Sequence, residues 1–519
     1  MEGRGRKARA AALFSLATGL SRIVGLLREV LVAYVFGVRG AINQFTIASQ
    51  IPNVVRSLVA DAALGAAFIP VFNELLEKGD EKRAWRVAST VATLAFLGLA
   101  SITALTMLFA EPLLGIFYDG PVPHIAVQLT WILMPTVVLL GFAGIVQAIL
   151  NSFGEFFVPA IAPVLWNLVI AGGLLFALTV DDADDQLLVY AWATLLGTIV
   201  QVLFPLPWLR GRSGRLRIAF DWRDQAVRRV FILMLPVTLG LGLINVNALV
   251  DTVFASILDP DEAPRAIESA FRVYMLPQGI FAVAIAAVLF PALSRFSAAG
   301  DTDGFRRTVG EGIRTIHYLL LPAAVISAVL AEPIVQVLFQ RGAFDADQRE
   351  LVAQCLAAFS LGLAANGALL LLNRAFFSMQ RPWLPTAAAA GNLLLNAVLD
   401  WLLYQRAGVW GIPLATSIAN IVFFTVQWHV LRRSLGSLEG RRTVRAVTLM
   451  LACCVPLAAT AYGLWWVVDR TLGDGFAPQL LGLLLGMAAG SALYLWLTRR
   501  LRMAEADLVL GVVRRRLAR

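Results

Sequence analysis

Apolar segments of about 20 residues or more follow one another along almost the whole chain, and this pattern constrains the fold more than any other feature. Of the 519 residues, 59% are hydrophobic and only 15% are charged, whereas about 25% of a soluble domain is charged. Soluble cores cannot bury such an excess, which excludes an ordinary cytosolic enzyme, a disordered chain, collagen and a disulfide scaffold. The sequence therefore predicts an all-α polytopic membrane protein.

We predict fourteen spanning helices, which leave no room for a soluble domain, since the longest connection is about 20 residues, around 210–228. The N-terminal segment resembles a signal peptide, but its apolar run continues through Arg22 and Arg28 without a cleavage site, so it is interpreted as the first span. The predicted spans are residues 9–36, 41–73, 86–110, 124–150, 157–180, 186–209, 229–257, 266–294, 313–340, 349–378, 383–404, 410–431, 446–468 and 477–498.

Positive charge alternates from one loop to the next. Cytoplasmic loops of membrane proteins are enriched in Lys and Arg, so this alternation predicts that both termini are cytoplasmic. It also accounts for the net charge of +9 without nucleic acid as a partner. The arginine-rich stretches are the N-terminus and residues 74–86, 210–229, 295–314, 432–445 and 499–519, whereas the alternate loops, such as 111–124 and 181–185, carry few positive charges or none.

Two pairs of similar segments repeat at nearly the same offset. The segment 152–159 resembles 378–385, 226 residues later, and the segment ending at Pro70 resembles the one ending at Pro291, 221 residues later. Duplicated halves around a central cavity are a common plan of transporters. We therefore expect two pseudo-symmetric six-helix lobes and two C-terminal helices: residues 1–225 (spans 1–6), 226–440 (spans 7–12), and 441–519 with spans 13–14 and a basic cytoplasmic tail.

Arg22, Arg28, Arg56 and Arg272 lie inside predicted spans. An ionisable residue there costs about 2.5–3.5 kcal/mol on insertion scales, so each should face protein or water. Two acids, Glu29 and Asp61, can pair with them as structural ion pairs, or the arginines can snorkel to an interface, but a positive surplus is left over. Helical periodicity places Arg22 with Glu29 on one face, and Asn53 with Arg56 and Asp61 on another. The arginines, Arg22, Arg28, Arg56 and Arg272, indicate a cationic cavity for an anionic headgroup on a lipid tail.

Oxygen-bearing side chains form a second candidate site near the outer side. Asp251 lies in the outer half of span seven, Asn396 and Asp400 share one face of span eleven, and Thr416 begins span twelve. Such ligands suit a hard cation such as sodium or a proton relay, and helix-end capping is the structural alternative. The three histidines share no metal-ligand spacing, and no nucleophile motif or phosphate-binding loop occurs, so no catalytic residue or further cofactor is expected.

With these motifs together, the chain resembles the MurJ (MviN) family, which belongs to a superfamily that includes multidrug exporters and polysaccharide-lipid flippases. The resemblance covers about residues 10–500. The motifs that carry it are residues 21–29, 51–56, 61–70, 271–279, 289–294 and 337–344.

This resemblance implies fourteen helices in two lobes around a V-shaped cavity. It implies a transporter, not an enzyme, that flips lipid II from the inner to the outer leaflet of the bacterial cytoplasmic (inner) membrane for peptidoglycan synthesis. Lipid II would be the partner, with cell-wall synthesis proteins as further candidates and a monomer as the favoured state. The family's cavity arginines match Arg22, Arg28, Arg56 and Arg272, its second-span acid matches Asp61, and the sodium ligands of some members would match Asp251, Asn396, Asp400 and Thr416.

The chain departs from the family pattern at Asn43 and Phe271, where members often carry Asp. Both changes remove negative charge from the cavity. A flippase for a different polyprenyl-linked oligosaccharide stays open as an alternative, because pyrophosphate recognition would look the same. Three other functions are disfavoured. A drug exporter would favour acids in the cavity, and an intramembrane enzyme would need a set of catalytic residues. A scaffold protein would gain nothing from arginines inside its spans, which are costly to insert.

Overall fold

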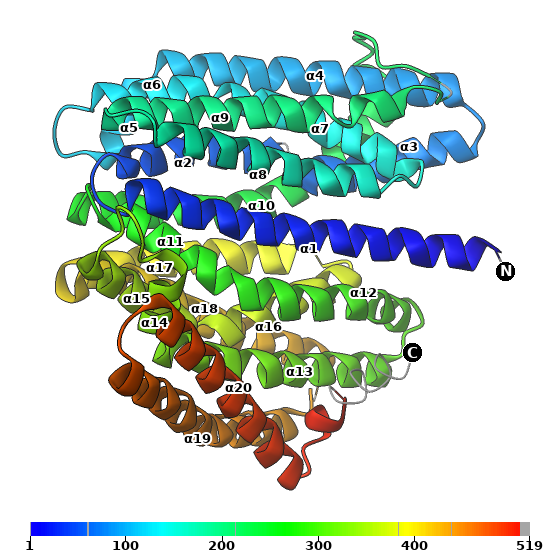
Figure 1. The fold of residues 1–519 in the computed structure, drawn as a ribbon. Coiled ribbons are helices and arrows are strands. Elements are labelled where there is room, and N and C mark those ends of the chain that lie inside the picture. The colour runs from blue at the N-terminus through cyan, green and yellow to red at the C-terminus, as the bar shows by residue number, and fades with distance from the viewer. Residues whose placement is uncertain (1, 60–61, 213, 382, 437, 509–519) are drawn as a thin grey trace. The chain divides into compact units, whose positions relative to one another are not determined.

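The computed structural model describes residues 2–59, 62–212, 214–381, 383–436 and 438–508, and every regular element within them is helical (Figure 1). The chain divides into two compact units, Met1–Arg265 and Ala266–Arg519. The boundary lies beyond residue 225 because α10 (Gln225–Leu258) packs within the first unit, against α2 (Ile42–Val59) and α3 (Ala62–Glu77). The predicted division into 1–225, 226–440 and 441–519 groups spans rather than packed units, and it stays a prediction.

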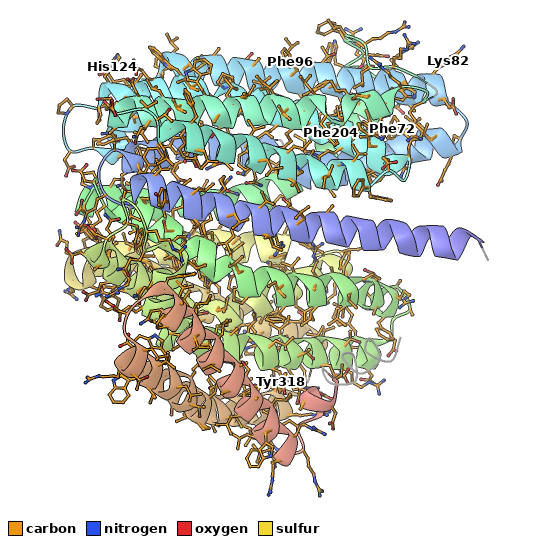
Figure 2. The ribbon with its side chains drawn as sticks, in the orientation of Figure 1. Phe72, Lys82, Phe96, His124, Phe204 and Tyr318 are labelled. Carbon is orange, nitrogen blue, oxygen red and sulfur yellow. The ribbon has the colours of Figure 1, made fainter. Side chains whose placement is uncertain are left out.

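The first unit is built from helices that cross between two ends. Lys82 at the start of α4 and His124 at the start of α6 lie at opposite ends of it (Figure 2). In this unit α1 packs against α8, α8 against α9, α2 against α6, and α3 against α4 and α7. The remaining bounds are α1 Glu2–Phe36, α4 Glu81–Leu108, α5 Ala110–Leu114, η1 Gly115–Phe117, α6 His124–Leu133, α7 Pro135–Ser152, α8 Phe157–Ala177, α9 Ala183–Leu203 and η2 Leu206–Leu209.

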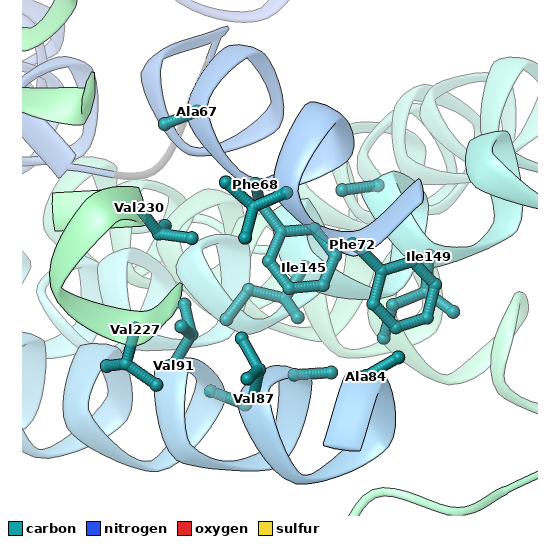
Figure 3. Packing of buried hydrophobic residues seen from close by; sticks show 14 of the residues in the cluster. Ala67, Phe68, Phe72, Ala84, Val87, Val91, Ile145, Ile149, Val227 and Val230 are labelled. Carbon is teal, nitrogen blue, oxygen red and sulfur yellow. The ribbon is translucent and has the colours of Figure 1, made fainter. Parts of the chain in front are cut away.

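A buried apolar cluster joins α3, α4, α7 and α10 near the charged end of α4 (Figure 3). Phe72 of α3 lies at its centre, with its ring 6.1 Å from those of both Trp85 and Phe153 in edge-to-face geometry. Such aromatic pairs add about 0.5–1.5 kcal/mol beyond area burial. Because lipid tails are as apolar as leucine, this close packing, more than exclusion of water, holds the four helices together.

The second unit is arranged around α13, which packs against α12, α15, α16 and α19. Helices α15 and α16 meet at a 46° bend at Gly362, where an added Cβ would lie 2.7 Å from Cα of Ser417. Glycine is therefore required for this approach of α18. The bounds are α11 Ala263–Pro277, which begins in the first unit, the π-helical turn η3 Gln278–Ala282, α12 Val283–Ala298, α13 Thr302–Val329, α14 Ala331–Phe339, α15 Ala346–Leu361, α16 Leu363–Ser378, α17 Trp383–Ala407, η4 Gly408–Trp410, α18 Gly411–Leu435, α19 Gly440–Leu472 and α20 Phe476–Arg500.

In the described part of the chain, nine helical stretches are long and apolar enough to cross a membrane, or ten if the bent pair α15–α16 is one span. One of the nine, Trp383–Leu435, is 53 residues long and consists of α17 and α18, which pack against each other. The expectation of a polytopic all-helical protein is confirmed, and the count of fourteen stays a prediction.

Aspartate side chains cap several of these helices, as expected for residues that compete for backbone N–H groups. Asp224 precedes α10 and accepts from the N–H of Ala226 at 2.7 Å. It also accepts two hydrogen bonds from Arg83, both at 3.0 Å. The hydrogen bonds from Arg83, supported by the Ala226 N–H, hold the pKa of Asp224 below its ordinary value of 3.8, although partial burial opposes this. Asp80, Asp182, Asp301 and Asp345 cap α4, α9, α13 and α15 in the same way.

Asp224→Ala should lower the melting temperature in detergent at neutral pH by roughly 2–8 °C. The cap contributes about 1 kcal/mol and an exposed ion pair about 0.2–1 kcal/mol, and 1 kcal/mol shifts the midpoint of a unit of this size by about 2–4 °C. Because the folded pKa is lowered, the stabilising charge is present at neutral pH and is lost as the pH falls through the folded pKa. The difference from wild type should therefore shrink below pH 4, whereas Glu77→Ala should cause little change at either pH. A difference that does not depend on pH would contradict the ion-pair assignment.

Candidate functional site

Glu29 of α1 lies between two guanidinium groups inside the first unit. One carboxylate oxygen accepts from Nη2 of Arg28, and the other accepts from Nη2 of Arg265 at 2.9 Å. All three side chains are at most 9% exposed. These three groups together carry one positive charge in excess, and all three are buried.

The guanidinium of Arg28 is also held by an aromatic ring. Its Cζ lies 4.8 Å from the ring centroid of Trp166 in α8, the helix that packs on α1. A cation over an indole is worth about 0.5–2 kcal/mol, depending on desolvation. The buried Nε of Arg28 has no hydrogen-bond partner among the described residues. Most buried donors in proteins are paired, so this N–H is a place where a ligand acceptor would be stabilised.

Asn43 connects two turns at one end of the first unit. Its Nδ2 donates to the carbonyl oxygens of Val38 at 2.8 Å and Asp261 at 2.5 Å, and its Oδ1 accepts from the N–H of Arg265 at 2.8 Å. The side chain is fully buried. An amide can donate and accept at once, whereas an ionised carboxylate only accepts. Unlike the Asp that the resemblance implies at this position, Asn43 therefore donates to carbonyl oxygens, including a third, that of Gly40, at 3.2 Å.

Asn43→Asp should destabilise the protein, because a carboxylate would face the carbonyl oxygens of Val38 and Asp261 without a proton to donate. Leaving a buried polar group unsatisfied costs about 1–3 kcal/mol, which corresponds to roughly 2–12 °C in the melting temperature of a unit of this size. Thermal unfolding monitored by size-exclusion chromatography measures the shift. Asn53→Asp, at a half-buried position of the same helix, is the matched control, and equal melting of Asn43→Asp and wild type would contradict this account.

The other predicted residues of the first unit differ in exposure. Arg22 is exposed on α1, whereas Asn53 and Arg56 are half-buried, three residues apart on α2. Asp61 lies outside the described residues. The structure thus brings Arg28 and Glu29 into contact, and it places Asn53 and Arg56 on neighbouring turns of one helix face.

Arg272 belongs to the second unit and lies on α11. Its side chain is 45% exposed, and Nη2 donates to Oε1 of Glu268 at 2.9 Å, one turn earlier. Its neighbour Phe271 contacts the rings of Tyr274 and Phe359 at centroid distances of 5.7 and 5.5 Å. Where family members often carry an acid beside this arginine, the chain therefore has an aromatic cluster, and Glu268 supplies the nearby negative charge instead.

The predicted cation ligands fall in both units. Asn396 and Asp400 are fully buried on α17, and Nδ2 of Asn396 donates to Oδ2 of Asp400 at 3.0 Å. Thr416 is half-buried on α18, which packs against α17. Asp251 is 9% exposed on α10 of the first unit. A buried carboxylate beside an amide oxygen has the donor chemistry that a hard cation requires, so the residues of the second unit fit such an ion.

Three arginines with defined partners were not among the predicted site residues. Arg265 is 3% exposed and pairs with Glu29, although the sequence places it in a polar loop. Arg314 is 1% exposed and pairs with Glu439 and Glu505. Arg374 lies inside a predicted span with Cζ 5.3 Å from the ring centroid of Phe290. The cost of placing a charge inside an apolar run is a signal that could have singled out Arg314 and Arg374, which both lie inside predicted spans.

Comparisons with known proteins agree over most of the chain. The family model described as lipid II flippase MurJ matches residues 32–485. A probable lipid II flippase MurJ of Vibrio cholerae is 31% identical, over 95% of this chain and 97% of that protein. A similar protein of Haemophilus influenzae is 30% identical over 87% of this chain and 91% of its own length. The lipid II flippase MurJ of Burkholderia cenocepacia is 26% identical over 87% and 95%.

Solved structures support the same fold. A lipid II flippase MurJ in an inward closed conformation superposes with a TM-score of 0.76 at 23% identity, over 94% of this chain and 99% of that one. An inward-facing multidrug resistance MATE family transporter of the MOP superfamily follows with a TM-score of 0.68 at 16% identity, over 81% and 96%. The match of the family model to most of the chain, together with relatives at 30–31% identity, shows that the chain belongs to the lipid II flippase MurJ family.

Proposed function

We propose that this chain flips lipid II, the undecaprenyl-pyrophosphate-linked peptidoglycan precursor, from the inner to the outer leaflet of the bacterial cytoplasmic membrane. The observation that carries the proposal is the family-model match over residues 32–485, which spans both units. On this proposal the chain is a transporter that carries out no covalent chemistry, in keeping with a family of flippases.

The arginines are the groups that would bind the pyrophosphate. Planar guanidinium forks suit phosphate oxygens, and Arg28 brings both the excess charge of its cluster and an N–H that is open to an acceptor. Arg22, Arg56 and Arg272 are proposed to complete the site, with Glu29, Asn53 and Asp61 as polar neighbours. Glu29 is a positioning residue in this scheme, because it orients Arg28 against Arg265.

Alternating access is the proposed cycle. Two compact units of similar size suit a mechanism in which lobes rock around a substrate site. The lipid tail would stay beside the cavity while the headgroup crosses within it. A cation at Asp251, Asn396, Asp400 and Thr416, or the membrane potential, would reset the cycle, since one charge moving through 100 mV is worth about 2.3 kcal/mol.

Fourteen spans with both termini cytoplasmic are the proposed topology. Helices α17 and α18 have 25 residues each, or about 38 Å at 1.5 Å per residue, so each is long enough for a bilayer core of about 30 Å and Trp383–Leu435 would supply two spans. Helices α1, α2 and α10 carry in-span polar residues, and they would be spans that face the cavity. The arginine-rich loops set the orientation. A monomer suffices for this mechanism, and cell-wall synthesis proteins are candidate partners.

The test is replacement of a native flippase. A bacterium whose own lipid II flippase can be depleted would express this chain, while growth and outer-leaflet lipid II are followed together. We expect growth to be restored and lipid II to become accessible outside. Membrane insertion and a monodisperse purified protein establish folding. A folded protein that restores neither would favour a flippase for a different polyprenyl-linked oligosaccharide.

A further inference from the structure

The connection between α9 and α10 contains a non-helical segment, residues 214–223, that lies along the start of α4 and ends in a turn at residues 222–223 (Figure 1). Alternate backbone N–H groups bind hydroxyl groups of that helix. Those of Arg217, Ala219 and Asp221 donate to Ser89 at 3.1 Å, Thr93 at 3.2 Å and Thr90 at 3.4 Å, respectively. The segment, called the α4 strap below, is therefore held by its main chain, which leaves its side chains available.

Both ends of the α4 strap are anchored. An added Cβ on Gly214 would lie 2.3 Å from the indole of Trp85, so only glycine permits this approach. Leu216 packs against the buried cluster of α3, α4, α7 and α10. Just beyond the strap, Asp224 binds Arg83 through two hydrogen bonds. The strap is thus a fixed part of the first unit.

Exposed apolar side chains of the strap are flanked by basic ones. Ile218 is 84% exposed, Phe220 is 61% exposed and Trp222 is 63% exposed. The side chains of Arg215, Arg217 and Arg223 are exposed before and after this apolar group, and the acid within it, Asp221, is half-buried. Aromatic residues flanked by arginine are typical of segments at a membrane interface.

The position of the α4 strap along α4 fits that interface. The first turns of α4 are charged, from Glu81 to Arg86, and the apolar run begins at Val87. Ser89 lies about 12 Å along the helix axis from Glu81, at 1.5 Å per residue. The hydroxyls that hold the strap are therefore at the beginning of the apolar run, where the hydrocarbon core meets the headgroups. Figure 2 shows Lys82 at this end of α4 and Phe96 farther along it.

A hollow precedes the α4 strap in the chain. It has a volume of about 430 Å³ and is lined by Pro207, Trp208, Arg210, Gly211 and Arg212. The guanidinium of Arg212 lies 5.0 Å from the ring centroid of Phe153, which fixes one side of it. Two guanidinium groups beside an exposed indole match a phosphate joined to an acyl chain.

We propose that the α4 strap and this hollow bind anionic phospholipids. Ile218, Phe220 and Trp222 insert at the acyl boundary, Arg215, Arg217 and Arg223 contact headgroup phosphates, and Arg210 and Arg212 hold one headgroup in the hollow. In the proposed orientation this leaflet is cytoplasmic. The inference does not depend on lipid II transport, and its tests measure phospholipid contact alone.

The membrane depth of a spin label on the α4 strap tests whether the strap inserts into the bilayer. The full-length protein, with its three cysteines replaced by alanine, carries a spin label at Ile218→Cys in nanodiscs that contain phosphatidylglycerol. We expect the label to be more accessible to oxygen than to a water-soluble nickel relaxant. A label at Lys82→Cys is the aqueous control. A label at Ile218→Cys that is as accessible to nickel as the control would overturn the proposal.

A comparison of an anionic with a zwitterionic phospholipid tests whether the arginines bind headgroup phosphates. Native mass spectrometry of the full-length protein compares phosphatidylglycerol with phosphatidylcholine. Wild type should prefer phosphatidylglycerol, and Arg210→Ala/Arg217→Ala should reduce its affinity for that lipid by about fivefold per arginine removed. Arg432→Ala/Arg433→Ala removes two exposed arginines from α18 and should keep the preference. Equal binding of both lipids by wild type, or equal losses in the two double variants, would refute the site. Thermal melting confirms that each variant is folded.

Discussion

We expect Arg28→Ala to abolish growth rescue and to reduce outer-leaflet lipid II by at least about 30-fold, with expression near that of wild type. The substitution removes the guanidinium that carries the excess charge of the buried cluster and the N–H that is open to a ligand. Truncating one partner of a buried charge pair costs about 2–5 kcal/mol, which corresponds to the expected loss. The fold is spared because Glu29 keeps its hydrogen bond from Arg265.

Three variants separate binding from charge and from stability. Arg28→Lys keeps the charge but loses the planar fork, so an intermediate activity is expected. Arg86→Ala, an exposed position on α4, should rescue growth like wild type. Arg272→Ala should be as inactive as Arg28→Ala, although its ion pair with Glu268 is exposed and worth about 0–1 kcal/mol of stability. Normal rescue by both Arg28→Ala and Arg272→Ala would sink the assignment of these arginines to the substrate site.

The positions of Arg22, Arg28, Arg56 and Arg272 inside spans could be predicted, because the free-energy cost of inserting a charge into a membrane depends on the apolar run around it. Any charge inside an apolar run of spanning length is conspicuous, whatever it touches. The same argument does not single out Arg265. It follows the polar residues Asp259, Asp261 and Glu262, so the sequence pattern alone indicates a charge in a loop. In the structure α11 begins at Ala263, and the partner that buries Arg265 is Glu29, 236 residues earlier. A pattern read along the chain contains no information on such a contact.

The packing of α10 is a second contact of this kind. Side-chain complementarity sets it, and α10 packs on α2 and α3, which lie far from it in the sequence. The division into 1–225, 226–440 and 441–519 comes from repeated motifs and stays a prediction. Similarly, the sequence marks Asn43 only as the loss of an acid, because its hydrogen bonds to Asp261 and Arg265 form only where two turns meet in space.

Arg314→Ala lowers the melting temperature of the purified protein by roughly 6–20 °C, the largest stability effect we expect from a single substitution. Nε of Arg314 donates to Glu505 at 3.0 Å and Nη1 donates to Glu439 at 2.8 Å, which ties α13 to the start of α19 and to the segment after α20. Removing one partner of a buried ion pair costs about 3–5 kcal/mol, because the other charges stay buried. At about 2–4 °C per kcal/mol, this gives the expected shift.

Neutralising the acids distinguishes uncompensated charge from lost packing. Arg314→Met combined with Glu439→Gln and Glu505→Gln should recover at least half of the lost melting temperature, since well-packed neutral groups often replace buried ion pairs without loss. Arg307→Ala, exposed on the same helix, should melt within about 4 °C of wild type. If the triple variant melts no higher than Arg314→Ala, packing by the Arg314 side chain rather than its charge holds α13 against α19, and the ion-pair account fails.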